Sequence, residues 1–171
     1  DPRTSVIEDR VYMTYTAYDS VTPPQGAVTS ISKDDFLAKR FENWTTPVIV
    51  TPSGVDDKDL ALLPQKVDGK FLLYHRIASR ICADLLSEIK DGTPISRCIE
   101  IMGPREGMWD AAKVGIAGPP LKVPGGYLML YHGVSHRKRY RVGAVLLDET
   151  GMQVVARSAD PVFEPVAEYE L

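Results

Sequence analysis

Three β-rich runs of similar sequence recur along the chain, and each ends in a tyrosine. The final residues, Tyr15, Tyr74 and Tyr131, are 59 and 57 residues apart, so the period is nearly constant. Each run follows a proline, a short strand and a tight polar or glycine turn such as Asp68-Gly69, which is typical of a β-hairpin. The three runs occupy residues 10–15, 70–74 and 126–131.

A strand-rich repeat near 58 residues is typical of a β-propeller, because a four-stranded blade needs neighbouring blades to bury both of its faces. Three repeats predict about three blades, fewer than the roughly four to eight of a closed ring. The alternative is a β-sandwich with coincidental spacing. Further strands are predicted at residues 27–32, 47–51, 142–147 and 153–156. Residues 78–90 fit either a helix or, as their position favours, a strand, a turn and a strand.

The composition supports an all-β, turn-rich domain, since 13 glycines and 13 prolines are spread along 171 residues. A net charge of -3 gives no broad positive field for nucleic acid. No apolar stretch approaches the roughly 18 to 20 residues of a membrane helix. Cys82 and Cys98 could pair but do not form a disulfide framework, so we expect a reducing, cytoplasmic location. We expect residues 1–171 to be one partial domain, truncated at both ends, because the sequence begins at Asp1 without a methionine.

The end of each repeated run is polar where a purely structural strand would stay apolar. These ends are Thr14-Tyr15-Thr16, His75-Arg76 and His132-Gly133. Because the inner strands of propeller blades converge on one axial channel, we expect these residues to meet there and to bind anions and sugar hydroxyls. Taken singly, His75 and His132 also fit partly buried structural histidines, and Arg76 fits a simple ion pair.

Other candidate residues have weaker local signals. Asp1 could act as an acid, with Arg3 beside it holding its carboxylate. The charged residues 56–59 fit a solvated turn. Residues 115–120 are rich in glycine but lack the Lys and Ser/Thr of a nucleotide loop, so we interpret them as a turn that lets the backbone approach the channel. The three histidines and two cysteines lack the spacing of metal ligands, so no metal is expected.

Several motifs, in order, resemble glycoside hydrolase family 130, and they run from Asp1 almost to Leu171. They are Asp1-Pro2-Arg3, Tyr12-Met13-Thr14-Tyr15, Asp57-Lys58-Asp59, His75-Arg76, Trp109-Asp110, Tyr131-His132-Gly133 and Tyr140-Arg141-Val142-Gly143. The resemblance implies a five-bladed β-propeller, of which this chain would cover about three blades. It also implies a phosphorylase that cleaves β-mannosides with inorganic phosphate and inversion, releasing α-mannose 1-phosphate. Some members of the family are hydrolases.

The resemblance implies roles for eleven residues. Asp1 matches the general acid, whose proton reaches the leaving oxygen through the 3-hydroxyl of the sugar. An inverting phosphorylase uses phosphate as the nucleophile, so it needs a cationic cradle in place of a base carboxylate. The phosphate-binding matches, including a protonatable histidine, are Arg40, Lys58, His132 and Tyr140. The residues expected to bind substrate are Arg3, Asp59, His75, Arg76, Asp110 and Lys113.

The resulting prediction is an enzyme that performs inverting phosphorolysis of β-mannosides. Its expected partners are a carbohydrate and phosphate as co-substrate, with no other cofactor, no nucleic acid and no membrane, and a homo-oligomer is compatible. Two alternatives stay open: a β-mannoside hydrolase, which should keep a second carboxylate across the sugar, and a non-catalytic carbohydrate-binding propeller fragment.

Overall fold

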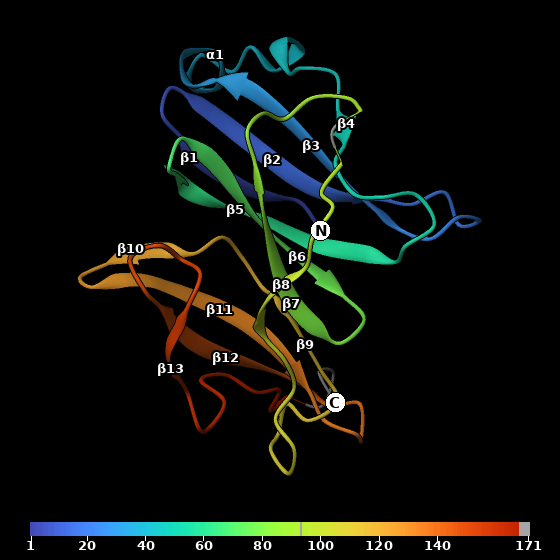
Figure 1. The fold of residues 1–171 in the computed structure, drawn as a ribbon, viewed down its shortest axis with the longest axis vertical. Coiled ribbons are helices and arrows are strands. Elements are labelled where there is room, and N and C mark those ends of the chain that lie inside the picture. Colours follow the sequence, from blue (N-terminus) through green and yellow to red (C-terminus); the bar gives the residue numbers. More distant parts are fainter. Residues whose placement is uncertain (93, 168–171) are drawn as a thin grey trace.

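The computed structural model describes residues 1–92 and 94–167, which form three antiparallel β-sheets in succession along the chain (Figure 1). The first sheet has the order β1 (Arg3–Ile7), β2 (Arg10–Ala17), β3 (Gln25–Ser32) and β4 (Val48–Ile49). The second has the order β5 (Asp57–Val67), β6 (Lys70–Ile77), β7 (Arg80–Leu86) and β8 (Ile99–Met102). The third has the order β10 (Leu121–Val123), β11 (Gly126–Val134), β12 (Tyr140–Leu147) and β13 (Val154–Arg157), with β9 (Lys113–Ile116) also paired to β11.

Turn chemistry explains the hairpins at the start of the second and third repeated runs. Asp68 and Gly69, between β5 and β6, have φ angles of 49° and 74°, which a two-residue hairpin turn requires. Gly125, between β10 and β11, has a φ angle of 81°, and Gly126, the first residue of β11, has a φ angle of 150°. Helix is limited to α1 (Lys33–Leu37) and a 3-10 turn, η1 (Phe41–Asn43), within the described residues. The prediction of an all-β, turn-rich domain is confirmed.

The repeated runs are the second strands of their sheets, β2, β6 and β11. The strands that precede these runs in the chain contact one another across the sheets: β1 contacts β5, and β5 contacts β9. The four further predicted strands are confirmed as β3, β4, β12 and β13, and residues 78–90 contain the strand β7. The interpretation of residues 56–59 as a solvated turn is wrong, because β5 begins at Asp57 and both Asp57 and Asp59 are buried.

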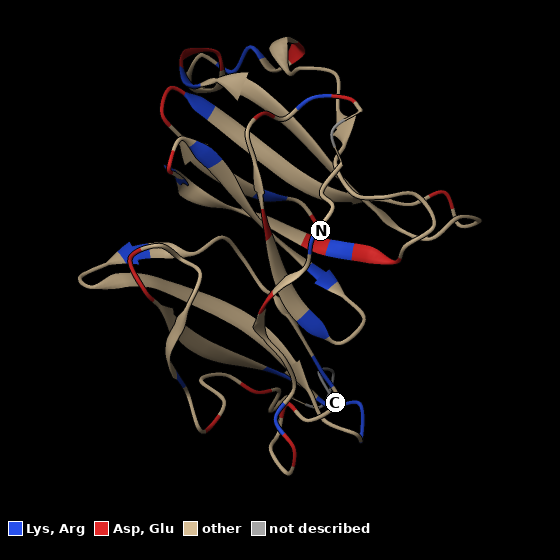
Figure 2. Ribbon diagram, in the orientation of Figure 1, with Lys and Arg blue, Asp and Glu red and all other residues tan. Residues whose placement is uncertain are grey.

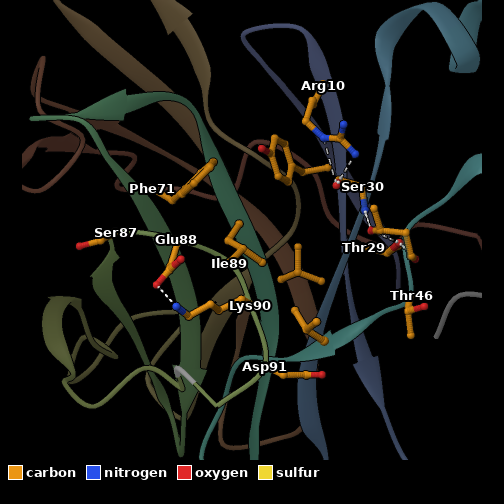
Figure 3. A pocket seen from close by; sticks show the side chains of 14 residues that line it. Arg10, Thr29, Ser30, Thr46, Phe71, Ser87, Glu88, Ile89, Lys90 and Asp91 are labelled. Atoms are coloured by element: carbon orange, nitrogen blue, oxygen red, sulfur yellow. Dashed lines mark hydrogen bonds and ion pairs between the residues drawn. The ribbon is translucent and has the colours of Figure 1, made fainter.

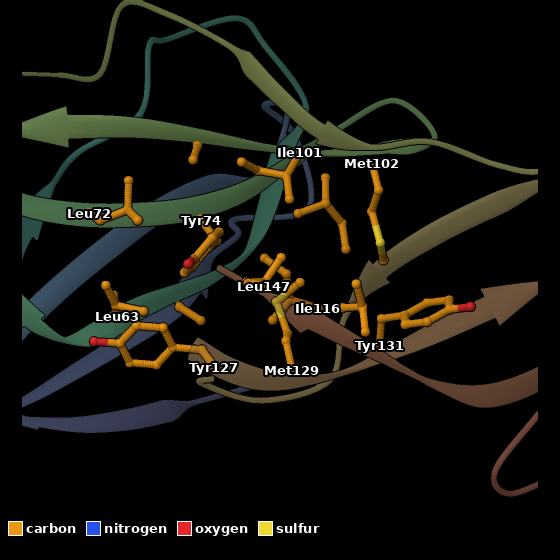
Figure 4. Packing of buried hydrophobic residues seen from close by; sticks show 14 of the residues in the cluster. Leu63, Leu72, Tyr74, Ile101, Met102, Ile116, Tyr127, Met129, Tyr131 and Leu147 are labelled. Atoms are coloured by element: carbon orange, nitrogen blue, oxygen red, sulfur yellow. The ribbon is translucent and has the colours of Figure 1, made fainter. Parts of the chain in front are cut away.

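Two apolar cores lie between the sheets. One joins the first sheet to the second and includes Ile7, Leu60 and Phe71. The other joins the second sheet to the third and includes Tyr74 and Tyr131, as Figure 4 shows. The middle sheet therefore packs through both faces, whereas each sheet of a two-layer sandwich packs through one. This arrangement excludes the sandwich alternative, and the three sheets pack face to face in succession.

Cys82 of β7 is disulfide-bonded to Cys98, which directly precedes β8, and their Cα atoms are 5.0 Å apart. That separation lies in the usual range for a disulfide. The pairing that the sequence left open is therefore present in the structure. No helix among the described residues is long and apolar enough to cross a membrane.

Candidate active site

Side chains from all three sheets meet around the carboxylate of Asp59. This residue belongs to the charged stretch at the start of β5, which Figure 2 shows by colour. Arg76 of β6 donates its Nε–H to Oδ2 of Asp59 over 2.6 Å. Nη2 of Arg3, in β1, lies 3.7 Å from Oδ1, and Nε2 of His132, in β11, lies 3.7 Å from Oδ2. The expected meeting of Arg76 and His132 is therefore observed, with Asp59 between them.

Gly115 lets strand β9 approach this cluster. A Cβ atom at this position would lie 2.4 Å from Cε1 of His132 and 2.6 Å from Oδ2 of Asp59, well inside van der Waals contact. The backbone approach expected for residues 115–120 is thus present. The interpretation as a turn is wrong at Gly115, which lies within a strand.

Arg3 ties the first sheet to the third. Its Nη2 donates to the carbonyl oxygen of Ile116 over 2.8 Å, and its Nε donates to that of Ala117 over 3.4 Å. Its Nη1 donates to the backbone carbonyl of Asp1 over 3.2 Å. Arg3 was expected to hold the carboxylate of Asp1, but it holds the backbone of that residue instead. Its donors are directed to protein carbonyls and Asp59, so Arg3 holds the parts of the site in place.

Lys113 and Tyr140 form the rim of the cluster beside His132. Nζ of Lys113 donates to the hydroxyl of Tyr140 over 2.9 Å and lies 5.1 Å from its ring centroid. The ring centroids of Tyr140 and His132 are 5.8 Å apart. Tyr140 is 52% exposed, so its hydroxyl and the ammonium of Lys113 lie where a ligand can reach them.

The positive charge of the cluster comes from arginine and lysine. Burial lowers the pKa of His132 to about 4; Asp59 opposes this shift, whereas Arg76, Lys113 and Arg3 add to it. The imidazole is therefore neutral at pH 7, and the expectation that it supplies positive charge is wrong. Burial also lowers the pKa of Arg3, although a guanidinium stays protonated in proteins.

Asp1 and Lys58 border the cluster. Asp1 directly precedes β1 and is exposed, with its carbonyl oxygen bound by Arg3. Lys58 is the neighbour of Asp59 in sequence and lies opposite Arg76 in the sheet. Its side chain is 31% exposed, and its Nζ lies 3.5 Å from Oδ1 of Asp56. Asp1 thus lies next to Arg3, and Lys58 lies next to Arg76. Both have exposed surface that a ligand can contact.

Two predicted site residues, His75 and Arg40, have other surroundings. His75 is fully buried and contacts Asp57, and it points to the face of β6 opposite that of its neighbour Arg76. Arg40 lies between α1 and η1, and its Nε lies 2.6 Å from Oδ1 of Asp35. The helix α1 lies at the outer end of the first sheet (Figure 1). An enclosed ring cannot contact a sugar, and an arginine in that outer segment is remote from β9, so these positions do not fit the expected roles.

Asp110 belongs to a separate buried network in the third sheet. It accepts hydrogen bonds from Tyr131 over 2.8 Å, from Arg105 over 2.8 Å and from Arg157 over 2.6 Å. Although burial raises its pKa, the hydrogen bonds from Arg105 and Tyr131 and the charge of Arg157 hold the pKa of Asp110 below its ordinary value. Its oxygens are occupied, so this position does not fit the expected binding of substrate.

Asp57 is a supporting residue that the sequence analysis placed in a turn. It is fully buried beside His75, directly before the two site residues Lys58 and Asp59. No local signal identifies it, because its partner His75 lies 18 residues later in the chain, on β6.

A cavity of about 400 Å³ lies outside the cluster, between the first and second sheets (Figure 3). Arg10 donates to Ser30 on one wall, and Glu88 pairs with Lys90 on another. These charged groups are paired locally, and no residue of the Asp59 cluster lines the cavity. Across residues 1–92 and 94–167, no group of three or more His, Cys, Asp or Glu side chains is placed to hold a metal ion.

The whole chain matches one known protein family. The sequence profile of the family described as beta-1,4-mannooligosaccharide phosphorylase matches residues 1–171. The chain belongs to glycoside hydrolase family 130. The resemblance seen in the sequence motifs is confirmed.

Curated relatives in this family are phosphorylases of β-mannosides. The chain is 34% identical over 172 residues to a beta-1,2-mannobiose phosphorylase of Thermoanaerobacter sp. (strain X514), covering 100% of this chain and 54% of the relative. It is 31% identical over 179 residues to a 1,2-beta-oligomannan phosphorylase of the same strain, covering 99% of this chain and 54% of the relative. The chain thus spans about half the length of the curated relatives it matches.

Solved structures share the fold. The beta-1,2-mannobiose phosphorylase of Listeria innocua, in complex with beta-1,2-mannobiose, has a TM-score of 0.79 and 28% identity, over 99% of this chain and 46% of that chain. A putative glycoside hydrolase of Bacteroides ovatus ATCC 8483 has the same TM-score at 23% identity, over 99% of this chain and 56% of that chain. The three sheets are therefore consecutive blades of a family 130 propeller, and the predicted fold class is confirmed.

Proposed function

We propose that the protein containing this chain cleaves β-1,2-linked mannosides by phosphorolysis, with inversion, and releases α-mannose 1-phosphate. The observation that carries this proposal is the convergence of Arg3, Arg76 and His132 on Asp59 from three blades. Lys113 and Tyr140 lie beside His132, and Arg3 binds the backbone of Asp1. Guanidinium and ammonium groups placed together suit a phosphate dianion. The curated relatives, which are named as β-1,2-mannobiose and oligomannan phosphorylases, support the substrate class and the reaction.

In the proposed reaction, a phosphate oxygen attacks the anomeric carbon from the face opposite the leaving group. The bond between that carbon and the glycosidic oxygen breaks, and the leaving oxygen receives a proton that originates on Asp1 and passes through the 3-hydroxyl of the sugar. Asp1 ends as a carboxylate, and the single displacement inverts the anomeric centre. Lys58, neutral His132 and Tyr140 supply hydrogen-bond donors to the phosphate.

The surroundings of Asp59 favour phosphorolysis over hydrolysis. An inverting hydrolase needs a second carboxylate that activates a water on the far face of the sugar. Asp59 instead accepts a hydrogen bond from Arg76, with Arg3 and His132 each 3.7 Å away, so cationic and polar groups surround its oxygens. A carboxylate held in this way organises the cations and is poorly placed to activate water.

The test is an assay of the protein as its gene encodes it. β-1,2-Mannobiose is incubated with and without inorganic phosphate, and products are followed by ³¹P and ¹H NMR. We expect α-mannose 1-phosphate and mannose with phosphate, and no cleavage without it. Cleavage without phosphate would instead support the hydrolase, and binding without turnover would support a carbohydrate-binding propeller. β-1,4-Mannobiose is the matched substrate that tests the linkage.

We also propose that the reaction needs no cofactor besides phosphate and takes place in the cytoplasm. A reducing compartment would keep Cys82 and Cys98 as thiols, although they are bonded in this structure. Trapping free thiols at the moment of cell lysis tests the location: labelling of both cysteines supports it, and an intact disulfide contradicts it.

A further inference from the structure

A buried pair, Asp57 and His75, lies directly behind the Asp59 cluster. Nδ1 of His75 lies 2.8 Å and 3.0 Å from the two carboxylate oxygens of Asp57, and both side chains are fully enclosed. A carboxylate only accepts hydrogen bonds, so Nδ1 carries the proton. Nε2 of His75 has no hydrogen-bond partner among the described residues. Asp57 is therefore the polar anchor of the histidine ring.

The two aspartates that flank Lys58 contact adjacent residues of β6. Asp57 contacts His75, whereas Asp59 contacts Arg76. In a regular strand, residues two apart point to the same face, and adjacent residues point to opposite faces. Strand β5 thus cannot be regular between Asp57 and Asp59.

A bulge in β5 resolves this conflict. The pairing of β5 with β6 shifts register between Lys58 and Ala61. Asp59 has a φ angle of 56°, in the left-handed region that costs a non-glycine residue roughly 1–2 kcal/mol. Such a conformation persists only where the surrounding structure holds it. At the start of β5 the backbone N–H of Asp57 donates to Pro24 of the first blade over 3.2 Å, while its side chain is held by His75.

We propose that the buried pair of Asp57 and His75 is a positioning device for the active site. It fixes the start of β5 so that the bulge at Asp59 forms and directs this carboxylate to Arg3, Arg76 and His132. It sets Lys58 at the edge of the same cluster. The pair touches no ligand itself and acts through Asp59 and Lys58. Its catalytic consequence rests on the proposed phosphorolysis.

The test replaces both members of the pair in the protein as its gene encodes it. Exchanging a buried hydrogen-bonded pair for apolar residues of similar volume is often nearly neutral in stability, whereas removing one partner leaves the other polar group buried and unpaired. We expect the double variant Asp57→Leu/His75→Leu to keep its melting temperature within a few degrees. We expect its kcat/KM for phosphate to fall about tenfold to a hundredfold, as for a misplaced site.

Two single variants separate positioning from stability. His75→Asn retains an N–H near the place of Nδ1, and we expect its kcat/KM to stay within about threefold of the wild type. Tyr74→Phe is the matched control on the same strand, since it removes a buried hydrogen bond to the carbonyl of Gly151. This control should lower the melting temperature and leave kcat/KM unchanged.

A crystal structure of the double variant gives a readout that does not depend on turnover. We expect Asp59 to leave the left-handed region and to lose its contact with Arg76. A double variant with wild-type kcat/KM, or with Asp59 unmoved, overturns the inference. If the wild type shows no phosphate-dependent turnover, the proposed function fails, and the position of Asp59 in the variant alone decides whether the pair positions it.

Discussion

Arg3 and Ile116 are 113 residues apart in the chain, yet Nη2 of Arg3 donates to the carbonyl oxygen of Ile116 over 2.8 Å. This bond joins the first blade to the third across the edge of the second. The same guanidinium lies 3.7 Å from Asp59 and binds the backbone of Asp1. A single buried side chain therefore connects the position of the proposed acid to the position of the cationic cluster.

Arg3→Met should destabilise the protein by about 2–3 kcal/mol, because it removes charged hydrogen bonds and leaves buried carbonyl groups without their donor. Urea unfolding of wild type and variant measures the difference. Arg80→Met is the control, since Arg80 forms an exposed ion pair with Glu100 and such pairs contribute at most about 1 kcal/mol. Equal losses in the two variants would show that Arg3 does not join the blades.

His132 should make the protein less stable as the pH falls from about 6.5 to about 4. Its pKa is about 4 in the folded protein and near 6.5 in the unfolded chain, so in this window the unfolded chain binds a proton that the folded protein does not. The stability is fully present above pH 6.5, and roughly 3 kcal/mol is lost at the acid end.

The pH effect is measured by unfolding the wild type and His132→Asn across this range. The variant should lose less stability than the wild type on acidification. An NMR titration gives the pKa of His132 directly. A midpoint for His132 at or above 6.5 would contradict the neutral imidazole.

Gly115→Ala should disturb the cluster, because its Cβ would lie 2.4 Å from His132 and 2.6 Å from Asp59. Overpacking of this kind costs about 1–3 kcal/mol, and the displaced side chains should lower kcat/KM for phosphate at least about tenfold. Gly118→Ala is a matched control in the same segment, since no heavy atom lies within 4 Å of its added Cβ. Wild-type kinetics in Gly115→Ala would disprove the close approach.

Cys98→Ala should lower the free energy of unfolding of the oxidised protein by about 3 kcal/mol, because the bond between Cys82 and Cys98 closes a loop with a sequence separation of 16. Unfolding is measured with and without reductant. Under reducing conditions, variant and wild type should unfold at similar denaturant concentrations. Identical midpoints under oxidising conditions would show that the bond does not form.

Local signals were sufficient to predict most of the strands. The turn at Asp68 and Gly69 requires positive φ angles that glycine and aspartate tolerate, so its hairpin could be predicted from two residues. The charged start of β5 could not be predicted in this way, because the partners of Asp57 and Asp59 lie 18 and 17 residues later, on another strand. From residue type alone, a run of charged residues predicts an exposed turn, although Asp57 and Asp59 are buried.

The site could be predicted in part. Arg76 lies two residues after Tyr74 and His132 lies one residue after Tyr131, and the propeller brings these two run ends together at Asp59. The neutral state of His132 depends on burial between blades, which the sequence does not display. The family resemblance implied that Asp110 binds substrate, and the sequence does not display its partner Arg157, which lies 47 residues away in β13.

A crystal structure of the protein soaked with inorganic phosphate tests the account most directly. We predict one phosphate within hydrogen-bond distance of Nζ of Lys58 and Nε2 of His132, beside Asp1. A phosphate held elsewhere, or no phosphate near these two atoms at a saturating concentration, would contradict the account.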